Sequence, residues 1–326
     1  MGKCAFVSWS WNDPTWTLAI DRYAGSEGIF FTRYVRAPTG HYLYHCDGDR
    51  ARRFSAQPFM TMKSLPPILE MKNVTVIRGD KNKKVLDAVS LTIQAGENVA
   101  ILGPNGAGKT SLIRTITREY YPVAHRNTVL RVMGEDHWNL FELRNLLGIV
   151  SGGLQLACAR EIPGIEMILS GFFGGIGLHQ RQRVTARMRE KAGEVLRFLE
   201  IAHLKNREMS VMSSGEARRF LIGRAIIHDP KALILDEPTN GLDLRATHHF
   251  KKVIRKIVHS GASIILVTQN LQDIIPEISR VVLMKGGKIV KDGPKKDALT
   301  QASIRELFNV PVEVHQKDGY FYTLGH

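Results

Sequence analysis

Two spacings of apolar residues divide the chain from residue 68 onwards into strands and helices. Runs rich in Val, Ile and Leu at 98–102, 232–236 and 263–268 are apolar except at their ends, which is typical of strands buried on both faces of a parallel sheet. Between such runs lie two helical stripes, Met188, Ala192, Val195, Leu196 and Leu199, and then Phe250, Val253, Ile254, Ile257 and Val258. This alternation predicts an α/β fold whose sheet is largely parallel and covered by helices.

Two further apolar runs precede these elements. The runs at 68–77 and 85–93 flank a polar Lys, Gly and Asp turn at 79–84, and they predict two neighbouring strands. The run at 98–102 leads directly into a glycine-rich loop and then a helical segment. Regular structure therefore begins close to residue 68.

Residues 1–66 differ in composition and hydrophobic pattern from the rest of the chain. They contain three of its four tryptophans, Trp9, Trp11 and Trp16, and they end at a Pro-Pro boundary at 66–67. Stretches at 28–35 and 41–46 resemble strands but keep no steady period. We expect this segment to be disordered, or untranslated if translation starts at Met60, Met62 or Met71. A small accessory domain that recognises a ligand is the alternative.

The charge balance is basic, with 45 Lys and Arg against 31 Asp and Glu, a formal net charge of +14. An acidic partner such as nucleic acid, anionic lipid or nucleotide phosphate would use this excess. A solvated surface explains it equally, because segments such as 251–256 interleave cations with apolar residues at helical spacing. Nucleic acid is the less favoured partner, since no aromatic–basic RNA motif or DNA-reading helix occurs.

Hydropathy and the number and spacing of cysteines indicate in which cellular compartment the protein lies. No run approaches the roughly 20 apolar residues that a spanning helix needs. Cys4, Cys46 and Cys158 are scattered without metal-site spacing, and the N-terminus lacks the layout of a secretory signal. We therefore expect a cytoplasmic protein, one that can also lie peripherally on the inner face of a membrane.

The strongest chemical signal is a phosphate-binding loop. The segment 103–110 fits GxxxxGK[ST], the Walker A pattern, and it lies between a predicted strand and a predicted helix, as that motif requires. Its glycines let successive backbone N–H groups point at phosphate oxygens. We expect Lys109 to reach the β- and γ-phosphates of ATP and Thr110 to ligate Mg²⁺. The predicted nucleotide contacts are Gly103, Pro104, Asn105, Gly106, Ala107, Gly108, Lys109, Thr110 and Ser111.

A second chemical signal is a pair of acidic residues at the end of the apolar run at 232–236. Asp236 at its end is placed to hold Mg²⁺, as a Walker B aspartate does. Glu237, one residue further on, is placed to act as general base on the attacking water. Two carboxylates in an ordinary loop would look the same, but their co-occurrence with the phosphate-binding loop favours an ATPase.

A third signal narrows the family. Residues 212–216, Met-Ser-Ser-Gly-Glu, open an amphipathic helical pattern upstream of Asp236, and they resemble the LSGGQ signature of ATP-binding cassette (ABC) proteins. Stretches at 138–151, 167–178 and 213–244 further resemble the molybdenum-transport or photorepair-type cassette ATPases. Residues 212–216 are called the signature segment below. The resemblance covers about 68–300.

The resemblance implies a P-loop NTPase (RecA-like) core with an antiparallel β subdomain and a helical subdomain at about 155–212. One cassette would occupy 67–305, followed by a C-terminal tail at 306–326. In that family two cassettes pair head to tail, so that Ser213 and Gly215 would contact ATP bound to the partner and Asp243 would fix the dimer geometry. The implied partners are a second cassette, a homodimer being favoured, and a permease on a separate chain.

Three positions depart from the family pattern. Arg78 stands near the place of the aromatic residue that stacks on adenine, and a guanidinium can also stack. Gln155, three residues beyond the expected place, is our candidate for the glutamine that ligates Mg²⁺. Gln269 replaces the switch histidine; its amide can donate a hydrogen bond to the γ-phosphate but carries no charge. We therefore expect ATP binding with slow hydrolysis.

The resemblance favours an ATPase subunit that drives a membrane transporter. The alternative is a soluble, non-transport cassette that acts as an ATP-gated clamp in a nucleic-acid or stress and repair pathway. A binding-only subunit is a third option, against which Lys109 and Glu237 argue. Molybdate as the cargo rests on the resemblance alone.

Overall fold

A computed structural model describes residues 66–79, 82–152 and 160–325, together with the backbone of four strands in the N-terminal part. The chain divides into two compact units, residues 1–64 and residues 65–326. In the first unit, β1 (Leu18–Gly25), β2 (Gly28–Ala37), β3 (Gly40–Asp47) and β4 (Arg50–Ala51) form a four-stranded sheet in that order. The predicted strand-like stretches at 28–35 and 41–46 fall within β2 and β3.

The second unit is built around a six-stranded sheet of order β13-β12-β7-β11-β10-β9. Its strands are β7 (Val99–Leu102), β9 (Leu147–Ser151), β10 (Ala232–Asp236), β11 (Ser263–Thr268), β12 (Arg280–Lys285) and β13 (Lys288–Pro294). All neighbours pair in parallel except β12 and β13. The predicted runs at 232–236 and 263–268 match β10 and β11 residue for residue, which confirms the parallel α/β core.

A three-stranded antiparallel sheet lies beside this core, in the order β6-β5-β8. It consists of β5 (Leu69–Arg78), β6 (Lys83–Ile93) and β8 (Val129–Val132). The buried side of α1 (Lys109–Ile116) belongs to the same apolar cluster as residues of both sheets. The antiparallel β subdomain thus holds the helix that follows the phosphate-binding loop.

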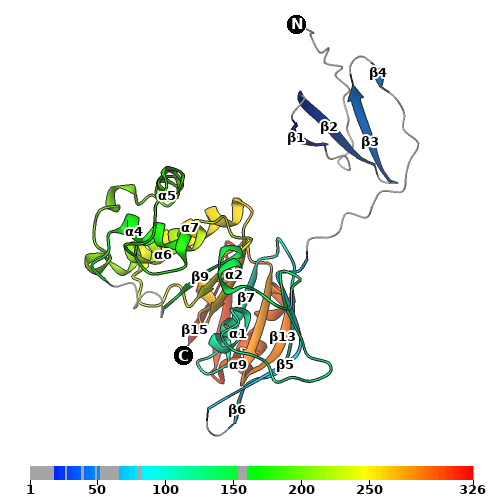
Figure 1. The fold of residues 1–326 in the computed structure, drawn as a ribbon. Helices are drawn as coiled ribbons and strands as arrows, with labels where there is room; N and C mark the ends of the chain where they lie inside the picture. Colours follow the sequence, from blue (N-terminus) through cyan, green and yellow to red (C-terminus); the bar gives the residue numbers. More distant parts are fainter. Residues whose placement is uncertain are drawn as a thin grey trace. The chain divides into compact units, whose positions relative to one another are not determined.

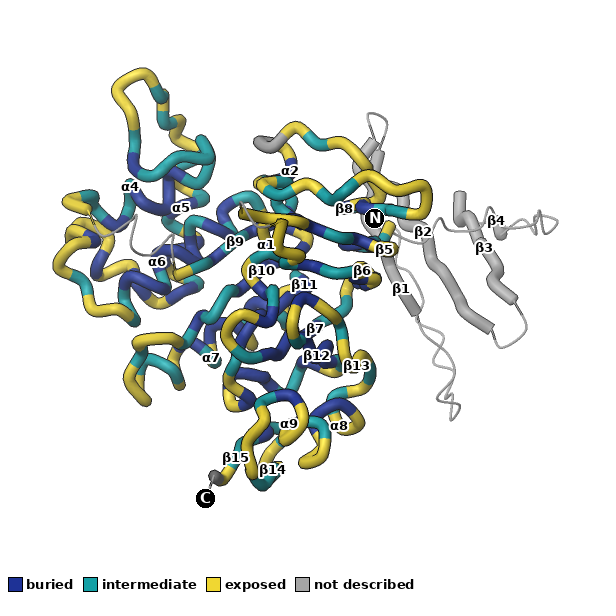
Figure 2. The backbone as a smooth tube through the Cα atoms, turned by 90° about the horizontal axis from the view of Figure 1, so that it is seen from below, coloured by how far each residue is buried: buried dark blue, intermediate teal, exposed yellow. Residues whose placement is uncertain are grey.

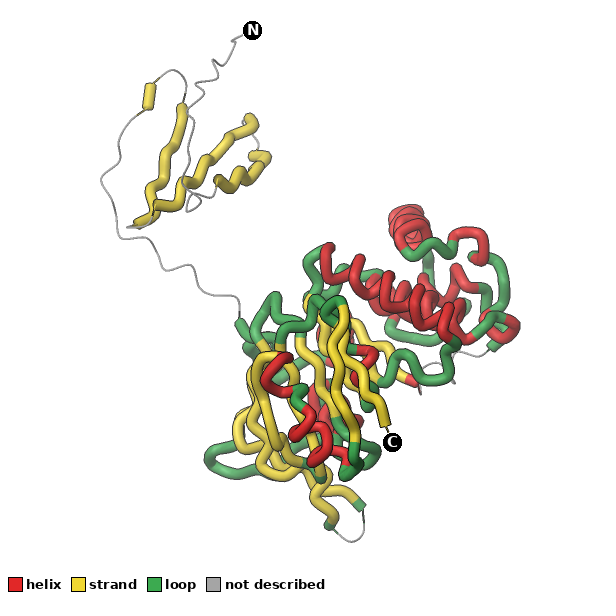
Figure 3. The backbone as a smooth tube through the Cα atoms, turned by 180° about the vertical axis from the view of Figure 1, so that it is seen from behind, coloured by secondary structure: helices red, strands yellow, loops and turns green. Residues whose placement is uncertain are grey.

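Several helices share a second apolar cluster with the central sheet and extend to one side of it (Figures 1 and 3). They include α4 (Gly164–Leu169), α5 (Ala186–Phe198), α6 (Ser214–Ile226) and α7 (Leu244–His259). The remaining helices are α2 (Leu140–Leu146), α8 (Lys295–Ala298) and α9 (Gln301–Phe308), with short 3₁₀ turns at Ser170–Phe173, Ala202–Leu204, Met209–Val211 and Leu271–Asp273. Helices α4 and α5 lie within the range 155–212 where we expect the helical subdomain.

Strand pleating explains why two cores form on either side of one sheet. Successive strand residues point to opposite faces. Accordingly Leu233 and Leu235 of β10 belong to the core under the helices, while Ala232 and Ile234 belong to the core shared with α1 and the antiparallel sheet. All four are fully buried, as the dark blue central strands of Figure 2 show.

The C-terminal residues form a hairpin. Strands β14 (Val312–Lys317) and β15 (Tyr320–Gly325) pair antiparallel, and β15 lies against the 3₁₀ turn at Leu271–Asp273. Phe321 is buried there and joins the helical core. The segment that we expected to be a tail therefore packs on the domain.

Candidate functional site

The phosphate-binding loop connects β7 to α1, as the pattern predicts, and its shape depends on Gly108. Gly108 has φ +101°, a backbone conformation that side chains rarely adopt, and a Cβ there would lie 2.7 Å from the Val85 carbonyl oxygen. The N–H of Gly287 donates to the Ala107 carbonyl at 2.9 Å, which ties the loop to the β12–β13 turn. The loop is thus closely held on two sides while its inner side stays open.

Lys109, the first residue of α1, lies at the centre of the site. Its side chain is only 6% exposed, and Nζ donates to the carbonyls of Gly103 at 2.7 Å and Pro104 at 3.2 Å. The same Nζ lies 3.1 Å from Oε1 of Glu237. The loop and the segment after β10 therefore meet at this ammonium group.

A cavity of about 420 Å³ opens over the loop. Besides the loop, it is lined by the hairpin residues Lys83 and Lys84 and by Glu237. Three lysines and the N-terminus of α1 give it a positive field with one opposing carboxylate. A phosphate chain fits this donor set, because the loop offers backbone N–H groups at the N-terminus of α1 and its turn at Gly108 has no room for a side chain.

The acidic pair lies at the end of β10, where parallel strands deliver their catalytic side chains. Burial, together with the neighbouring charge of Glu237, raises the pKa of Asp236 to about 6, although the nearby charge of Lys109 opposes the rise. Glu237 has φ +46°, and its N–H donates to the Val267 carbonyl at 2.8 Å. Ionising this buried carboxyl group is costly unless a cation lies nearby, and a bound Mg²⁺ would supply that cation.

Gln269 lies next to this pair through its backbone. Its N–H donates to Oε2 of Glu237 at 3.3 Å, which places the start of the Gln269 side chain beside the candidate base. The preceding residue, Thr268, donates its hydroxyl to buried Asp273 at 2.6 Å. Asp273 also accepts from Thr239 at 2.7 Å, so one carboxylate joins the segments that follow β10 and β11.

The signature segment begins α6, as predicted. Ser213 is the N-cap: its hydroxyl accepts from the N–H of Glu216 at 3.3 Å, and the Glu216 carboxylate accepts from the Ser213 N–H at 2.9 Å. A Cβ on Gly215 would lie 2.7 Å from the Cβ of Ala246, so α6 and α7 begin in close contact. Asp243 caps α7 by accepting from the Ala246 N–H at 2.7 Å.

The signature segment faces a second cavity, of about 510 Å³. Ser213, Gly215 and Asp243 line it together with cations such as Arg219 and Arg245. The two cavities share no lining residue. Within one chain, therefore, the structure does not bring Ser213, Gly215 and Asp243 to the phosphate-binding loop.

Two predicted residues stand apart from this arrangement. The Arg78 guanidinium lies 4.3 Å above the ring of Tyr120, whose hydroxyl accepts from Arg114 at 2.7 Å. Arg78 is not among the residues that line the 420 Å³ cavity. Gln155 lies outside the described residues.

Sequence reasoning missed Arg218. It is 3% exposed and donates to the carbonyls of Glu237, Pro238 and Asn240, the segment immediately after β10. The sequence shows two adjacent arginines, Arg218 and Arg219, and the apolar pattern around them does not tell which one is buried. A cation inside an otherwise apolar helical segment was the only available signal.

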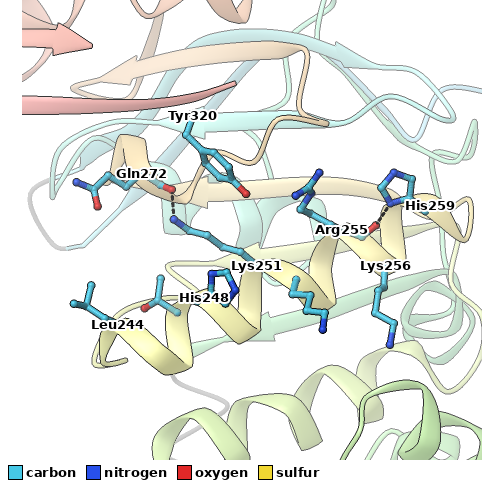
Figure 4. A pocket seen from close by; sticks show the side chains of 10 residues that line it. Leu244, His248, Lys251, Arg255, Lys256, His259, Gln272 and Tyr320 are labelled. Carbon is cyan, nitrogen blue, oxygen red and sulfur yellow. Dashed lines mark hydrogen bonds between the residues drawn. The ribbon is translucent and has the colours of Figure 1, made fainter. Parts of the chain in front are cut away.

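The largest described cavity, of about 750 Å³, lies along α7 and is basic (Figure 4). Three of its cations already have partners in the fold: Lys251 donates to the Gln272 carbonyl, Arg255 pairs with Glu277 and Lys256 pairs with Glu200. This favours the solvated-surface interpretation of the charge excess over a nucleic-acid site.

Among the described residues no cluster of His, Cys, Asp and Glu could hold a metal ion by itself, and none of the helices there has the length and apolar character to span a membrane.

Comparison with known proteins agrees with this geometry. The family model described as ABC transporter matches residues 86–240. The uncharacterized ABC transporter ATP-binding protein YlmA of Bacillus subtilis is 32% identical over 252 residues, covering 76% of this chain and 93% of that relative. The hemin import ATP-binding protein HmuV of Bradyrhizobium diazoefficiens is 30% identical over 249 residues, covering 74% and 89%. A solved inward-facing structure of a putative metal-chelate type ABC transporter superposes with a TM-score of 0.65 at 21% identity, covering 79% of this chain and 96% of that one.

Proposed function

This chain belongs to the ATP-binding proteins of the ABC transporter family, and from that premise we propose that it energises a membrane permease carried on a separate polypeptide. It is an ATPase. One observation carries the assignment of its site: the 3.1 Å ion pair between Lys109 and Glu237 brings the phosphate-binding cation and the candidate base into one cavity.

The chain's own residues suffice to outline the catalytic roles. Lys109 and the loop N–H groups bind the phosphates, and the cation stabilises the negative charge of the transition state. Glu237 accepts a proton from the attacking water, and the Gln269 amide donates to the γ-phosphate without adding charge. Thr110 and Asp236 would hold a Mg²⁺ ion, which would supply positive charge to neutralise the phosphates.

The active form in this proposal is a head-to-tail pair of cassettes. The signature cavity and the phosphate cavity are separate within one chain, so one cavity of each chain can close on the other chain's complementary cavity. Such an arrangement gives two equivalent sites related by two-fold symmetry. Ser213, Gly215 and Asp243 would then complete the partner's site.

The cargo we propose is metal-containing. The resemblance of 138–151, 167–178 and 213–244 to molybdenum-transport ATPases supports an oxyanion, and the names of two similar proteins refer to hemin and to a metal chelate. These cargoes share a metal centre in an anionic or chelated form. Co-purification with a permease, followed by cargo-dependent stimulation of ATP hydrolysis, would identify which form is carried.

Steady-state ATP hydrolysis by the purified protein tests the catalytic part. Glu237→Gln removes the candidate base and serves as the blank. We expect Mg²⁺-dependent turnover above that blank, with ATP binding retained in the variant. Turnover equal to the blank, with ATP still bound by both proteins, would contradict the assignment of Glu237 as the base of this chain.

A further inference from the structure

The loop after β10, residues 237–243, needs support from outside itself. It begins with Glu237 at φ +46°, a conformation that is unfavourable for a residue with a side chain and must be held by surrounding contacts. It then passes through Pro238 and a positive-φ glycine at 241 before Asp243 caps α7. The direction in which the Glu237 carboxylate points depends on how firmly this loop is held.

Arg218 of α6 supplies much of that support. Its guanidinium donates to the Glu237 carbonyl at 3.4 Å, to the Asn240 carbonyl at 3.2 Å and to the Pro238 carbonyl. A planar fork of five N–H groups can satisfy several carbonyls at fixed angles, which a lysine ammonium cannot do. Burial lowers the pKa of Arg218, because removing the charge from water is costly. The hydrogen bonds to these carbonyl acceptors offset that cost.

The same helix carries the signature segment. Arg218 lies five residues after the N-cap Ser213, and Ser214 Oγ donates to the Gly241 carbonyl at 3.2 Å. The first turns of α6 are therefore bonded to the loop after β10 at both its beginning and its end. On the opposite side, Thr239 bonds to Asp273, which also holds Thr268 next to Gln269.

We propose that Arg218 is a positioning residue for ATP hydrolysis: it fixes the backbone of Glu237 and ties this carboxylate to the helix that presents the signature segment. This inference rests on the proposed function, because it takes Glu237 as the base. It adds that a movement of α6, such as closure of the signature segment on a partner's ATP, is transmitted to the chain's own Glu237. Arg218 does not line the cavity over the phosphate-binding loop.

Replacing Arg218 has different effects on stability and on kcat, depending on whether its role is structural or positioning. Loss of packing alone would lower thermal stability and leave kcat of the folded fraction unaltered. Loss of positioning would lower kcat while KM and the Kd for ATP stay close to wild type, because the Lys109 loop is untouched. Small displacements of a reacting group can cost up to about 100-fold in rate.

The variant Arg218→Met removes all donors at similar side-chain length, and Arg218→Lys retains the charge without the fork. The matched control is Arg224→Met on the same helix, since Arg224 also donates to a backbone carbonyl, that of Gly175 at 2.8 and 3.1 Å, away from the loop after β10. We expect kcat to fall about 10- to 100-fold in Arg218→Met, less in Arg218→Lys, and less than twofold in Arg224→Met.

Each result is read per folded molecule, with melting temperature and ATP Kd measured for all proteins. Wild-type kcat in folded Arg218→Met, or an equal loss in Arg224→Met, would overturn the proposal. Should Arg218→Met fail to fold, Arg218→Lys decides, and wild-type kcat in that variant overturns the proposal. Failure of the proposed function looks different: wild type would then hydrolyse ATP no faster than Glu237→Gln.

Discussion

Gln269 has a neutral side chain at the place where the family resemblance implies a histidine. Its backbone N–H contacts Oε2 of Glu237 at 3.3 Å, so the side chain starts beside the base. A charge-assisted hydrogen bond contributes about 1.5–3 kcal/mol, and losing one in the transition state slows turnover roughly 10- to 150-fold.

We predict that Gln269→His raises kcat by roughly 10- to 150-fold, because an imidazolium adds positive charge facing the γ-phosphate. The measurement is steady-state hydrolysis at saturating ATP and Mg²⁺. Gln272→His, which places an imidazole on the exposed turn three residues away, is the matched control and should leave kcat unchanged. Equal rates for wild type and Gln269→His would show that this residue only positions the phosphate.

Asp236 makes the stability of the nucleotide-free protein depend on pH. Burial and the neighbouring charge of Glu237 together raise its pKa to about 6, whereas an exposed aspartate titrates near 3.8. The folded protein thus retains this proton where the unfolded chain has lost it. The stabilising contribution is complete below pH 3.8 and is lost as the pH rises through about 6.

We therefore predict that Asp236→Asn, which cannot ionise, gains stability relative to wild type as the pH rises. Its melting temperature minus that of wild type should be larger at pH 8 than at pH 4 when Mg²⁺ and nucleotide are absent. Addition of Mg²⁺ at pH 8 should shrink the difference, since a bound cation favours the carboxylate of wild type. A melting-temperature difference independent of pH would rule this out.

At the scale of elements, the Ser213 hydroxyl at the start of α6 has a structural role, and our proposal gives it a functional role as well. Ser213 caps a 13-residue helix, and its capping box with Glu216 satisfies two backbone donors. Thr185 caps α5, which has the same length, by accepting from the N–H of Met188 at 3.3 Å. The two caps have similar chemistry, and only Ser213 lies at the cavity that would face a partner's ATP.

We predict that Ser213→Ala and Thr185→Ala each lower the free energy of unfolding by about 1 kcal/mol, the usual loss for a removed N-cap. Only Ser213→Ala should also lower ATPase activity, by about tenfold or more, since it removes a hydroxyl from the composite site. Chemical denaturation and steady-state hydrolysis measure the two effects. Equal activity of the two variants would assign Ser213 a capping role alone.

The elements that sequence patterns predicted well are those whose environment is uniform. Strands β10 and β11 were predicted to the residue because both of their faces are buried and all their positions except Asp236, Ser263 and Thr268 are apolar. Strand β6 begins at Lys83, two residues before the apolar run, because hairpin pairing continues into polar residues and Lys83 pairs with Arg78. Backbone pairing has no hydrophobic signature, so strand ends were the least predictable part.

Contacts between elements were the other part that local patterns could not predict. The hydrogen bonds of Arg218 to the loop after β10 and the Asp273 bonds to Thr239 and Thr268 join residues distant in sequence. Motifs identified Lys109 and Glu237 because their chemistry is local to a loop and a strand end. The residues that hold those loops in place carry no motif of their own.

At the scale of the whole molecule, packing at the C-terminus shows the same limit. Residues 306–326 have weak amphipathic character and were expected to be a tail, yet Phe321 of β15 is 5% exposed in the helical core. Lys295 fixes this hairpin from α8 by donating to the Gly319 carbonyl at 3.2 Å. Phe321 can be buried only because α9 and the hairpin lie beside the central sheet.

The separation of the two ATP-binding half-sites leads to the last prediction, which concerns assembly. Glu237→Gln should bind ATP without consuming it, so the composite sites stay filled and the paired state accumulates. We expect light scattering coupled to gel filtration to give a mass near 36.6 kDa without nucleotide and twice that with ATP. The double variant Lys109→Ala, Glu237→Gln should remain at the lower mass with ATP, because it lacks the phosphate-binding cation. A Glu237→Gln protein that binds ATP and keeps the single-chain mass would exclude ATP-driven pairing of two copies, and the complementary signature would then have to come from a different chain.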